Sequence, residues 1–409
     1  MSGLQIYAPR ERALVGAADV VLRPLGWFRG DVTAPARSPS RVLLLRLERI
    51  GDLLMTLDAI ALARRAWPGA TIDLAVGSWN LPLAQLIPGI GTVRTVDVPW
   101  LARDGRGDAW STLVGRARAW KEAGYDIVVN FEPDIRTNAL AWLSGAPQRH
   151  GYWTGGGGAL LTHALAFDPT SHVGVNATRL IRAAAGSSSA TPDAESAAPA
   201  RLAVPPDATA RARARLAGLG RPVVGVHVSG GRESKQWHLD RFAVVARQLA
   251  ETRGAAIVLT GSDADRPMVA AVEARLDGVR VLNAAGTVDL VDLAGLLSEL
   301  NVLVTSDTGP MHLAAAVGTP LVALFGPADP RRYGPIGSEA HVLRVDLPCS
   351  PCGQVRLPPE RCRGHVPDCM DGIQVAAVVG AALALLDKSP RPTRAGARAL
   401  EMTCPLEIK

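Results

Sequence analysis

Three segments of the chain bring polar side chains and glycines together where an apolar run ends and a helical pattern begins. In the first segment, Arg46–Asp52, the carboxylate of Asp52 stands at the expected start of a helix. Free backbone N–H groups favour a negative charge there, and Gly51 permits a tight turn and the close approach of a ligand. Asp52 alone therefore fits a helix cap as well as a catalytic carboxylate.

The second segment, His227–Trp237, offers hydroxyl groups, two adjacent glycines and a lysine ahead of a helix. Such a turn can cradle phosphate oxygens with its backbone N–H groups, and Lys235 would add a point charge. The spacing of a P-loop, GxxxxGK(S/T), occurs nowhere in the chain. The segment therefore predicts an anion-binding loop of another kind.

The third segment, Val302–His312, runs from an apolar strand straight into an Asp-Thr-Gly turn. Pro310 then occupies the first turn of the next helix. Backbone N–H groups there have no partner within the helix, so the lack of one in proline costs no hydrogen bond. The free N–H groups of that turn would stabilise a diphosphate, and His312 follows within the same helix. A helix cap followed by a core histidine is the alternative interpretation.

The elements that must position these segments alternate between strands and helices along most of the chain. With 409 residues, two domains are expected, because one hydrophobic core rarely grows past about 250–300 residues. In the first half, strands are predicted at 42–45, 72–76, 93–98 and 126–130, and helices at 53–67, 108–123 and 134–143. After a linker at 186–206 that begins with Gly and Ser and ends with Pro-Pro, strands are predicted at 222–228, 256–260, 279–282, 301–305 and 320–325, and helices near 239–252, 264–275, 289–299 and 309–317.

Alternation of this kind predicts an α/β fold in which helices cover parallel sheets. Two such halves of similar size enclose a cleft, and ligands bind at the carboxyl ends of parallel strands. Each of the three segments follows a predicted strand, so we expect them to meet in that cleft. The glycine run Gly155–Gly158 has no such context and is expected to be a flexible loop.

The composition, 48% hydrophobic and 20% charged, is ordinary for a globular protein. No apolar stretch reaches the about 18 residues that a membrane span needs, and the longest, Val375–Leu386, predicts a packed helix. The first apolar stretch, Ala13–Leu22, contains Asp19 and has no cleavage site after it, so no signal peptide is expected. These features together predict a cytoplasmic protein.

The formal net charge of +6 is concentrated at the two ends of the chain, residues 1–40 and 388–409, which together carry +5. Residues 10–25 have the spacing of a short amphipathic helix. Basic ends suit a weak, salt-sensitive hold on an anionic membrane surface, although solvated tails without a partner fit equally well. A nearly neutral body with only 4% aromatic residues argues against nucleic acid as a partner.

Several blocks of the chain resemble glycosyltransferase family 9, the ADP-heptose:lipopolysaccharide heptosyltransferases. The matching blocks are Arg46–Asp52, Ser234–Trp237, Gly261–Arg266, Thr305–Ala316 and Gly318–Pro327, within roughly residues 41–375. The resemblance implies the GT-B fold, in which two Rossmann-like parallel-sheet domains face an interdomain cleft. The layout expected from it is a basic amphipathic extension (1–40), an acceptor-binding domain (41–185), the linker (186–206), a donor-binding domain (207–387) that contains a Cys-rich loop (349–369), and a basic tail (388–409).

The resemblance also implies an activity. A member of this family would be an inverting, metal-independent glycosyltransferase that moves heptose from ADP-heptose to a hydroxyl of a lipopolysaccharide core acceptor, a lipid A core that contains Kdo or heptose. It would need no cofactor and would work at the inner face of the inner membrane. The alternatives are another nucleotide sugar or acceptor, a binding protein that has lost transfer, and a zinc-dependent nucleic-acid module. The carboxylate retained at Asp52 argues against the loss of transfer.

The same resemblance assigns roles to individual residues. Asp52 would be the general base that takes the proton of the acceptor hydroxyl. The residues expected at the nucleotide sugar are Ser229, Lys235, Asp265, Val288, Asp307, Thr308, Gly309 and His312. Among them, Asp265 would hold the ribose and Val288 falls in the expected adenine loop. Arg49 and Arg136 are candidates for an anionic acceptor, but surface salt bridges explain both equally well.

Four of the five cysteines, Cys349, Cys352, Cys362 and Cys369, form a C-x2-C-x9-C-x6-C cluster, and the fifth lies apart in the tail. Four thiols this close in sequence can hold a structural zinc ion. A reducing compartment argues against disulfides, so reduced free thiols are the alternative to zinc.

Overall fold

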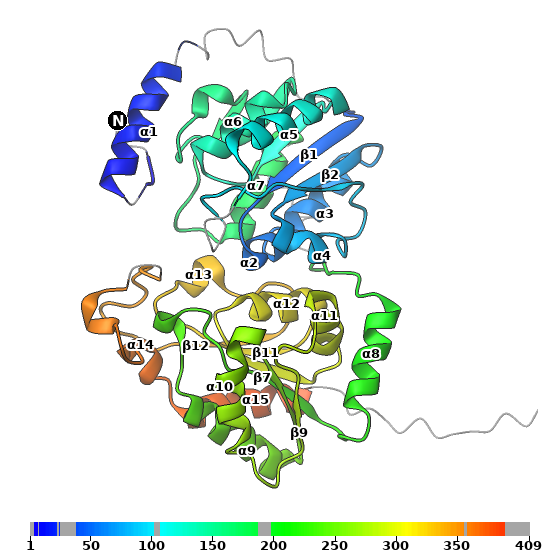
Figure 1. Cartoon of the computed structure of the whole chain (residues 1–409), viewed down its shortest axis with the longest axis vertical. Helices are drawn as coiled ribbons and strands as arrows, with labels where there is room; N and C mark the ends of the chain where they lie inside the picture. Colours follow the sequence, from blue (N-terminus) through cyan, green and yellow to red (C-terminus); the bar gives the residue numbers. More distant parts are fainter. Residues whose placement is uncertain are drawn as a thin grey trace, which may run out of the picture.

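Each half of the chain folds around a parallel β-sheet of six strands (Figure 1). The computed structural model describes residues 4–6, 8–22, 24, 38–101, 107–186, 198–355 and 358–388. The strand order is β3-β2-β1-β4-β5-β6 in the first sheet and β12-β11-β10-β7-β8-β9 in the second, and every pair of neighbours is parallel. Both halves therefore have the doubly wound topology of Rossmann-like domains, which confirms the predicted fold class.

The strands are short apolar runs, because helices cover both faces of each sheet and leave no face to solvent. The first sheet is built from β1 (Arg41–Arg46), β2 (Thr71–Val76), β3 (Val93–Thr95), β4 (Ile127–Asn130), β5 (Gln148–Tyr152) and β6 (His163–Leu165). The second is built from β7 (Val223–His227), β8 (Ala256–Thr260), β9 (Val281–Asn283), β10 (Val302–Ser306), β11 (Leu321–Leu324) and β12 (Ala340–Leu343). The central strands β1, β4, β7 and β10 are buried almost throughout.

Helices connect the strands and pack on both faces. In the first half they are α1 (Pro9–Leu22), α2 (Ile50–Leu54), α3 (Leu57–Ala66), α4 (Leu81–Ala84), α5 (Trp110–Ala123), α6 (Ile135–Leu143) and α7 (Val173–Ala184). In the second half they are α8 (Pro206–Leu216), α9 (Leu239–Arg253), α10 (Arg266–Glu273), α11 (Leu290–Ser298), α12 (Gly309–Val317), α13 (Pro330–Tyr333), α14 (Asp368–Asp371) and α15 (Val375–Lys388). The apolar run at 375–386 forms the packed helix α15, as predicted.

The winding of each sheet reverses between its first and fourth strands. β1 pairs with β2 on one side and β4 on the other, and β7 pairs in the same way with β8 and β10. Ligands of doubly wound sheets bind outside the carboxyl ends of the strands at this point. In Figure 1 these ends face each other across the boundary between the halves, with α2 on one side and α12 and α13 on the other.

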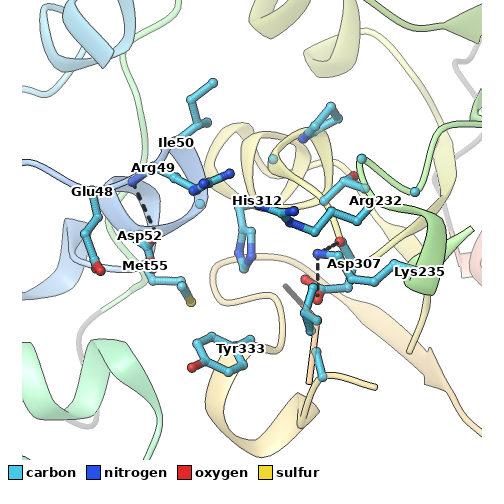
Figure 2. Close-up of a pocket in the computed structure, with 18 of the residues that line it drawn as sticks. Glu48, Arg49, Ile50, Asp52, Met55, Arg232, Lys235, Asp307, His312 and Tyr333 are labelled. Atoms are coloured by element: carbon cyan, nitrogen blue, oxygen red, sulfur yellow. Dashed lines mark hydrogen bonds and ion pairs between the residues drawn. The ribbon is translucent and has the colours of Figure 1, made fainter. Parts of the chain in front are cut away.

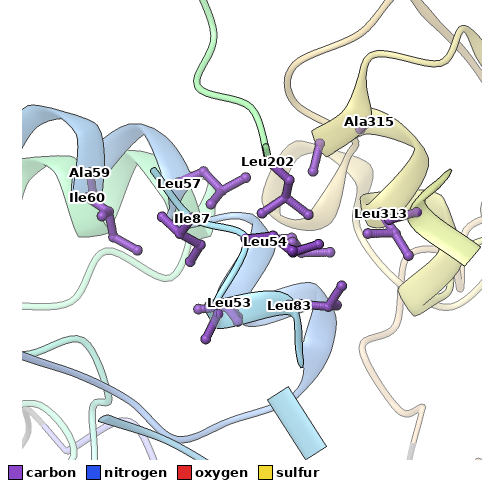
Figure 3. Close-up of a cluster of buried hydrophobic side chains, with 14 of the residues drawn as sticks. Leu53, Leu54, Leu57, Ala59, Ile60, Leu83, Ile87, Leu202, Leu313 and Ala315 are labelled. Atoms are coloured by element: carbon purple, nitrogen blue, oxygen red, sulfur yellow. The ribbon is translucent and has the colours of Figure 1, made fainter. Parts of the chain in front are cut away.

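A shared hydrophobic cluster joins the two halves beside this boundary (Figure 3). Leu54 of α2 and Leu57 of α3 belong to the same buried cluster as Leu313 and Ala315 of α12. Leu202, from the segment that connects the halves, lies between them. The halves therefore meet through a continuous apolar core as well as across the cleft.

The connecting segment is attached to both halves at neighbouring residues. The N–H group of Leu202 donates to the carbonyl of Ala316 in α12 (3.1 Å), and that of Ala203 donates to the carbonyl of Leu86 after α4 (2.8 Å). The linker predicted at 186–206 lies partly outside the described residues, and its part at 198–205 contains no helix or strand. The tail beyond residue 388 lies outside them altogether.

The N-terminal helix α1 packs against the first half. Val15 is buried on the glycine turn at 155–157, where a Cβ atom on Gly156 would lie 2.2 Å from Val15 Cγ1. Asp19 accepts the N–H of Gly157 (2.6 Å). The glycine run was predicted to be a flexible loop, but its glycines allow close packing, since a Cβ on Gly155 would lie 1.8 Å from the carbonyl oxygen of Pro133. Among the described residues, no helix is both long and apolar enough to cross a bilayer.

The structure departs from the prediction mainly at strands and helices whose sequences show no clear apolar pattern. The strands β5, β6 and β12 and the helices α7 and α8 were not predicted. β5 contains Arg149 and His150, and β6 and β12 lie at sheet edges, where a strand needs no long apolar run. The single helix predicted at 53–67 is two helices, α2 and α3. They are separated at Met55 and Thr56, where the hydroxyl of Thr56 donates to the carbonyl of Leu53 (2.6 Å).

Candidate active site

A cavity of about 2600 Å³ opens between the two halves at the carboxyl ends of the sheets. Asp52 and Arg49 line its wall in the first half. The wall in the second half includes all the residues predicted at the nucleotide sugar, Ser229, Lys235, Asp265, Val288, Asp307, Thr308, Gly309 and His312. The fold thus brings together residues that are up to 260 positions apart in the sequence, from Asp52 to His312.

Asp52 lies in the first turn of α2, directly after β1 (Figure 2). Its Oδ2 accepts the backbone N–H of Arg49 (3.3 Å) and so caps the helix, while Oδ1 lies 3.6 Å from Nη2 of Arg46. The side chain remains 23% exposed, enough for a substrate to reach it. Burial, followed by the negative charge of Glu48, raises the pKa of Asp52 to about 6. Such a carboxylate is ionised at pH 7 and is a stronger base than an ordinary aspartate.

Lys235 faces Asp52 from the opposite wall, at the end of the loop after β7. Its Nζ donates to the carbonyl of Asp307 (2.6 Å) and lies 3.2 Å from Oδ2 of the same residue (Figure 2). Gln236 folds the loop by accepting the N–H of Gly230 (2.8 Å) and donating to the carbonyl of Val228 (2.8 Å). A Cβ on Gly230 would lie 2.5 Å from the backbone of Lys235, so this compact turn requires glycine.

The start of α12 points its free N–H groups toward the same part of the cavity. Thr308 is the N-cap residue, in extended conformation, and its side chain makes no capping hydrogen bond. Its hydroxyl instead pairs with that of Thr305 (3.2 Å). Because the first N–H groups of a helix lack partners within it, this end of α12 favours an anion, and Lys235 lies beside it.

His312, in the second turn of α12, is buried between the two walls (Figure 2). Burial lowers its pKa to about 4, against the opposing charges of Asp307 and Asp52. The imidazole is therefore neutral at pH 7. The prediction that His312 would lie at the same site as the Asp-Thr-Gly turn is consistent with its place in the cavity wall.

Asp265 and Val288 lie at the far end of the cavity, after β8 and β9. Oδ2 of Asp265 accepts hydrogen bonds from the backbone N–H (2.8 Å) and the hydroxyl (2.6 Å) of Ser262. Burial opposes ionisation of Asp265, but hydrogen bonds from Ser262 and Ser229 outweigh it and lower its pKa. The group is a carboxylate at neutral pH, which suits it to accept hydrogen bonds from hydroxyl groups.

Three residues that the sequence analysis did not single out belong to the site. Glu132 lies two residues after β4 and accepts backbone N–H groups of the loop that leads into the helix of Asp52. Arg332 and Tyr333, in α13, line the cavity opposite α2, with the guanidinium 5.0 Å from the ring centre. Glu132 follows a predicted strand, the same position that identified Asp307, so the signal was present. The two residues of α13 carried no such signal.

The model of the family described as glycosyltransferase family 9 (heptosyltransferase) matches residues 116–359. The chain belongs to glycosyltransferase family 9. The matched segment covers all the residues of the cavity wall in the second half, but it begins after Asp52. The position of Asp52 is therefore known from the structure and not from the match. The expected enzyme class, a glycosyltransferase, is confirmed by this membership.

Bacterial relatives of this family 9 member match most of its length. It is 26% identical to lipooligosaccharide heptosyltransferase 2 of Haemophilus influenzae over 319 residues, 74% of this chain and 88% of the relative. It is 27% identical to lipopolysaccharide heptosyltransferase 1 of Pseudomonas aeruginosa over 328 residues, 76% of this chain and 86% of the relative.

Solved structures confirm the GT-B arrangement of the two domains. A family 9 glycosyltransferase from Veillonella parvula is 25% identical and has a TM-score of 0.72, with 87% of this chain and 99% of that chain covered. The ADP-heptose lipopolysaccharide heptosyltransferase II of Escherichia coli is 21% identical and has a TM-score of 0.67, with coverage of 85% and 98%. The second likeness concerns the fold alone.

Arg136 does not line the large cavity of this glycosyltransferase. It lies in α6, where it pairs with Asp134 (2.5 Å) and lies 3.6 Å from Glu11 of α1. Its guanidinium also stacks 4.5 Å from the ring centre of Trp100. These contacts fit the alternative given for Arg136, a surface salt bridge. Arg49, by contrast, lines the cavity next to Asp52.

The four clustered cysteines are free thiols in the loop at 349–369, beside the donor-side wall. Burial, together with the neighbouring Cys352 and Cys362, raises the pKa of Cys369 to about 11. Among the described residues, no group of three or more His, Cys, Asp or Glu side chains is arranged to hold a metal ion. A structural zinc at Cys349, Cys352, Cys362 and Cys369 and reduced free thiols both stay predictions.

Proposed function

We propose that this chain transfers heptose from ADP-heptose to a hydroxyl of a lipopolysaccharide core acceptor, with inversion at the anomeric carbon and without a metal cofactor. The observation that carries the proposal is the arrangement of one cavity. A carboxylate with a raised pKa, Asp52, lines one wall, and an anion-binding group, Lys235 with the start of α12, lines the other. The relatives named above are lipopolysaccharide or lipooligosaccharide heptosyltransferases, which supports the choice of donor and acceptor.

In the proposed reaction the acceptor hydroxyl attacks the anomeric carbon of the heptose from the side of Asp52. The new C–O bond forms as the bond to the diphosphate oxygen breaks, and the hydroxyl proton passes to the Asp52 carboxylate. Attack from the side opposite the leaving group inverts the anomeric centre. This geometry requires the base and the diphosphate site on opposite walls, which is how the two groups lie in the cleft.

The diphosphate of ADP gains negative charge as it leaves. Lys235 and the uncapped N–H groups of α12 are fixed in the cleft before the reaction, so they can stabilise that charge without rearranging. They supply the positive potential that a divalent cation supplies in other transferases. In this proposal Asp265 binds the ribose, and the segment around Val288 binds the adenine.

The acceptor is proposed to enter between the walls near Arg49 and Arg332. Both arginines line the cavity, Arg332 in α13 and Arg49 in the turn before α2. Two cations at the entrance suit an acceptor with carboxylate or phosphate groups, as in a lipid A core that contains Kdo. Such an acceptor is a glycolipid, so the enzyme would work at the cytoplasmic surface of the inner membrane.

The helix α1 is the proposed contact with that membrane. Leu14 and Val21 are seven residues apart and so share one face, and their side chains are 72% and 76% exposed. Arg10 lies on the same face, four residues before Leu14. An apolar stripe next to a cation suits a weak association with anionic lipid.

The proposal is tested by turnover of ADP-heptose on a lipid A core acceptor, with Asp52→Asn and a control, Asp240→Asn. Asp240 is also an acidic residue in the first turn of a helix, but in α9 and outside the cavity. Loss of a general base should lower kcat by about a hundredfold or more in Asp52→Asn, with ADP binding unchanged. Turnover that survives Asp52→Asn, or a wild-type enzyme that uses only another nucleotide sugar, would refute the proposal.

A further inference from the structure

Glu132 is a buried carboxyl group that joins the end of β4 to the loop after β1. The side chain is 2% exposed. Its Oε1 accepts two successive backbone N–H groups, those of Leu47 (2.8 Å) and Glu48 (3.1 Å). Both belong to the short segment between β1 and α2, and Asp52 lies in the first turn of that helix. Glu132 therefore fixes this segment to the neighbouring strand.

The contact follows from the order of the strands. β4 lies next to β1, so the residues that follow these two strands meet at the edge of the sheet. In the second half β10 lies next to β7 in the same way, and Asp307 after β10 contacts Lys235 from the loop after β7. Each half thus uses an acidic residue from its fourth strand to hold the loop of its first strand.

Three carboxyl groups surround the single guanidinium of Arg46. Its Nη1 lies 3.2 Å from Glu48 and 3.5 Å from Glu132, and its Nη2 lies 3.6 Å from Asp52. Burial alone would lower the pKa of Arg46, but the carboxylates raise it, so the guanidinium stays charged. One positive charge cannot balance three negative ones. Burial, with repulsion from Glu48, accordingly raises the pKa of Glu132 well above its usual range.

The carboxyl groups of Glu132 and Glu48 lie beside the same Nη1 of Arg46, at 3.5 Å and 3.2 Å, and so are close to each other. Two carboxyl groups this close repel each other when both are ionised, which favours a state in which one of them carries a proton. The pair then has a single negative charge, which Arg46 balances. Asp52 is then the second ionised carboxylate of the cluster, and it lines the cavity.

Groups from other elements do not disturb this balance. The titratable side chains that face the cluster are His312 of α12, Tyr333 of α13 and Tyr152 of β5. Burial lowers the pKa of His312 to about 4 and raises the pKa of both tyrosines. All three are therefore neutral at pH 7. None of the three adds a charge next to Asp52, whose charged neighbours are the cluster itself and Arg49 in the cavity wall.

We propose that Glu132 is a positioning residue for the proton acceptor: it fixes the loop of Asp52 to β4 and shares one proton with Glu48, so that Asp52 alone accepts the proton of the substrate. Glu132 does not line the cavity and acts only through Glu48, Arg46 and the backbone. This inference rests on the proposed role of Asp52 as the general base.

The test compares Glu132→Gln and Glu132→Ala with Asp126→Ala. A glutamine has the shape of a protonated glutamate and keeps the oxygen that accepts both N–H groups, whereas alanine removes it. Asp126 provides a matched control at the other end of the same strand pair, because its Oδ2 accepts the N–H groups of Ser40 (2.7 Å) and Arg41 (3.0 Å). Steady-state kinetics from pH 5 to 9, ADP binding by calorimetry and thermal unfolding would be measured for each variant.

We expect Glu132→Gln to keep wild-type kcat within about threefold and an unchanged acid limb of kcat/KM. Glu132→Ala should lose about ten- to a hundredfold in kcat, since a small misplacement of a catalytic group has effects of that size, while its affinity for ADP stays the same. Asp126→Ala should lose thermal stability without losing kcat. Activity that is kept in Glu132→Gln but lost in Glu132→Ala would distinguish a positioning role from a general loss of folding.

Three outcomes would overturn the inference. They are full activity in Glu132→Ala, a loss in Glu132→Gln as large as in Glu132→Ala, and a shift of the acid limb in Glu132→Gln. Asp52→Asn, measured alongside, separates this inference from the proposed function. If Asp52→Asn is inactive while Glu132→Ala is active, only the role given to Glu132 is refuted. If Asp52→Asn is active, the assignment of Asp52 as the general base is refuted as well.

Discussion

The imidazole of His312 occupies the space that a side chain at Gly51 would need. A Cβ atom on Gly51 would lie 2.7 Å from Cδ2 of His312, closer than such atoms approach in folded proteins. Gly51 belongs to α2 in the first half and His312 to α12 in the second. The glycine next to Asp52 therefore sets how closely the two walls of the cleft approach each other.

Gly51→Ala is expected to hold the walls apart and to lower kcat by about tenfold or more, because the base and the diphosphate site move out of register. Gly115→Ala is a suitable control, since Gly115 lies within α5 and no atom lies within 4 Å of the added methyl group. Steady-state kinetics and thermal unfolding of both variants give the answer. Wild-type turnover in Gly51→Ala would show that this contact does not control the cleft.

The pH dependence of kcat/KM should reveal the raised pKa of Asp52. A base works only when it is deprotonated, so kcat/KM should fall as the pH drops through about 6, the value to which burial and Glu48 raise the pKa of Asp52. His312, with a pKa near 4, should not contribute between pH 5 and 9. An acid limb near pH 4, the usual range of an aspartate, would contradict the role given to this carboxylate.

Lys235→Ala should weaken ADP binding by about tenfold or more, as expected for a lost hydrogen bond to a charged group. Calorimetry in the presence of EDTA is the measurement, and binding by the wild type should not change when EDTA is added. Lys388→Ala serves as the control, because that lysine is 62% exposed and pairs with Glu339 at the surface. Binding that requires a divalent cation would count against metal-independent transfer.

The neighbouring arginines of α13 should differ in their effect on the acceptor. Arg331 pairs with Asp329 (2.8 Å), whereas Nε of Arg332 is buried and has no hydrogen-bond partner among the described residues. Arg332→Gln is therefore expected to raise KM for an anionic acceptor by about tenfold, the effect of one lost charge-assisted hydrogen bond, and to leave ADP binding unchanged. Arg331→Gln should change neither. Weaker ADP binding in Arg332→Gln would instead assign Arg332 to the diphosphate.

Replacing Leu14 and Val21 by serine should reduce binding to vesicles that contain anionic lipid, since each change removes an exposed apolar group from α1. Vesicle sedimentation at low and at physiological salt would measure this. The control is Val244→Ser, because Val244 is 43% exposed on α9 of the other half. Equal binding by the Leu14/Val21 double variant and the wild type would exclude α1 as the membrane contact.

The sequence was sufficient to predict the fold class and the residues that line the second-half wall of the cavity, because both depend on local patterns. Uninterrupted apolar runs marked the central strands, and the residues after β7 and β10 were readable as anion-binding turns. Glu132 was missed for a different reason. Its partner segment, Arg46–Asp52, is about 80 residues earlier in the chain, and only the pairing of β1 with β4 brings the two together.

Other departures have equally physical causes. The glycines at 155–157 looked like a flexible loop because flexibility and close packing require the same residue type. Arg136 was indistinguishable from an acceptor-binding arginine until its contacts with Asp134 and Trp100 were known. The edge strand β12 has too few apolar residues to be recognised without its neighbour β11.

The attachment of the connecting segment bears on how the cleft can open. The N–H groups of Leu202 and Ala203 are consecutive along the chain but are bonded to different domains, one to α12 and the other to the end of α4. Sliding one domain along the other would break one of these bonds, whereas rotation about this point stretches neither. The peptide unit between the two residues thus fixes the position of one domain along the other, and a rotation about it can widen the cleft with both bonds intact.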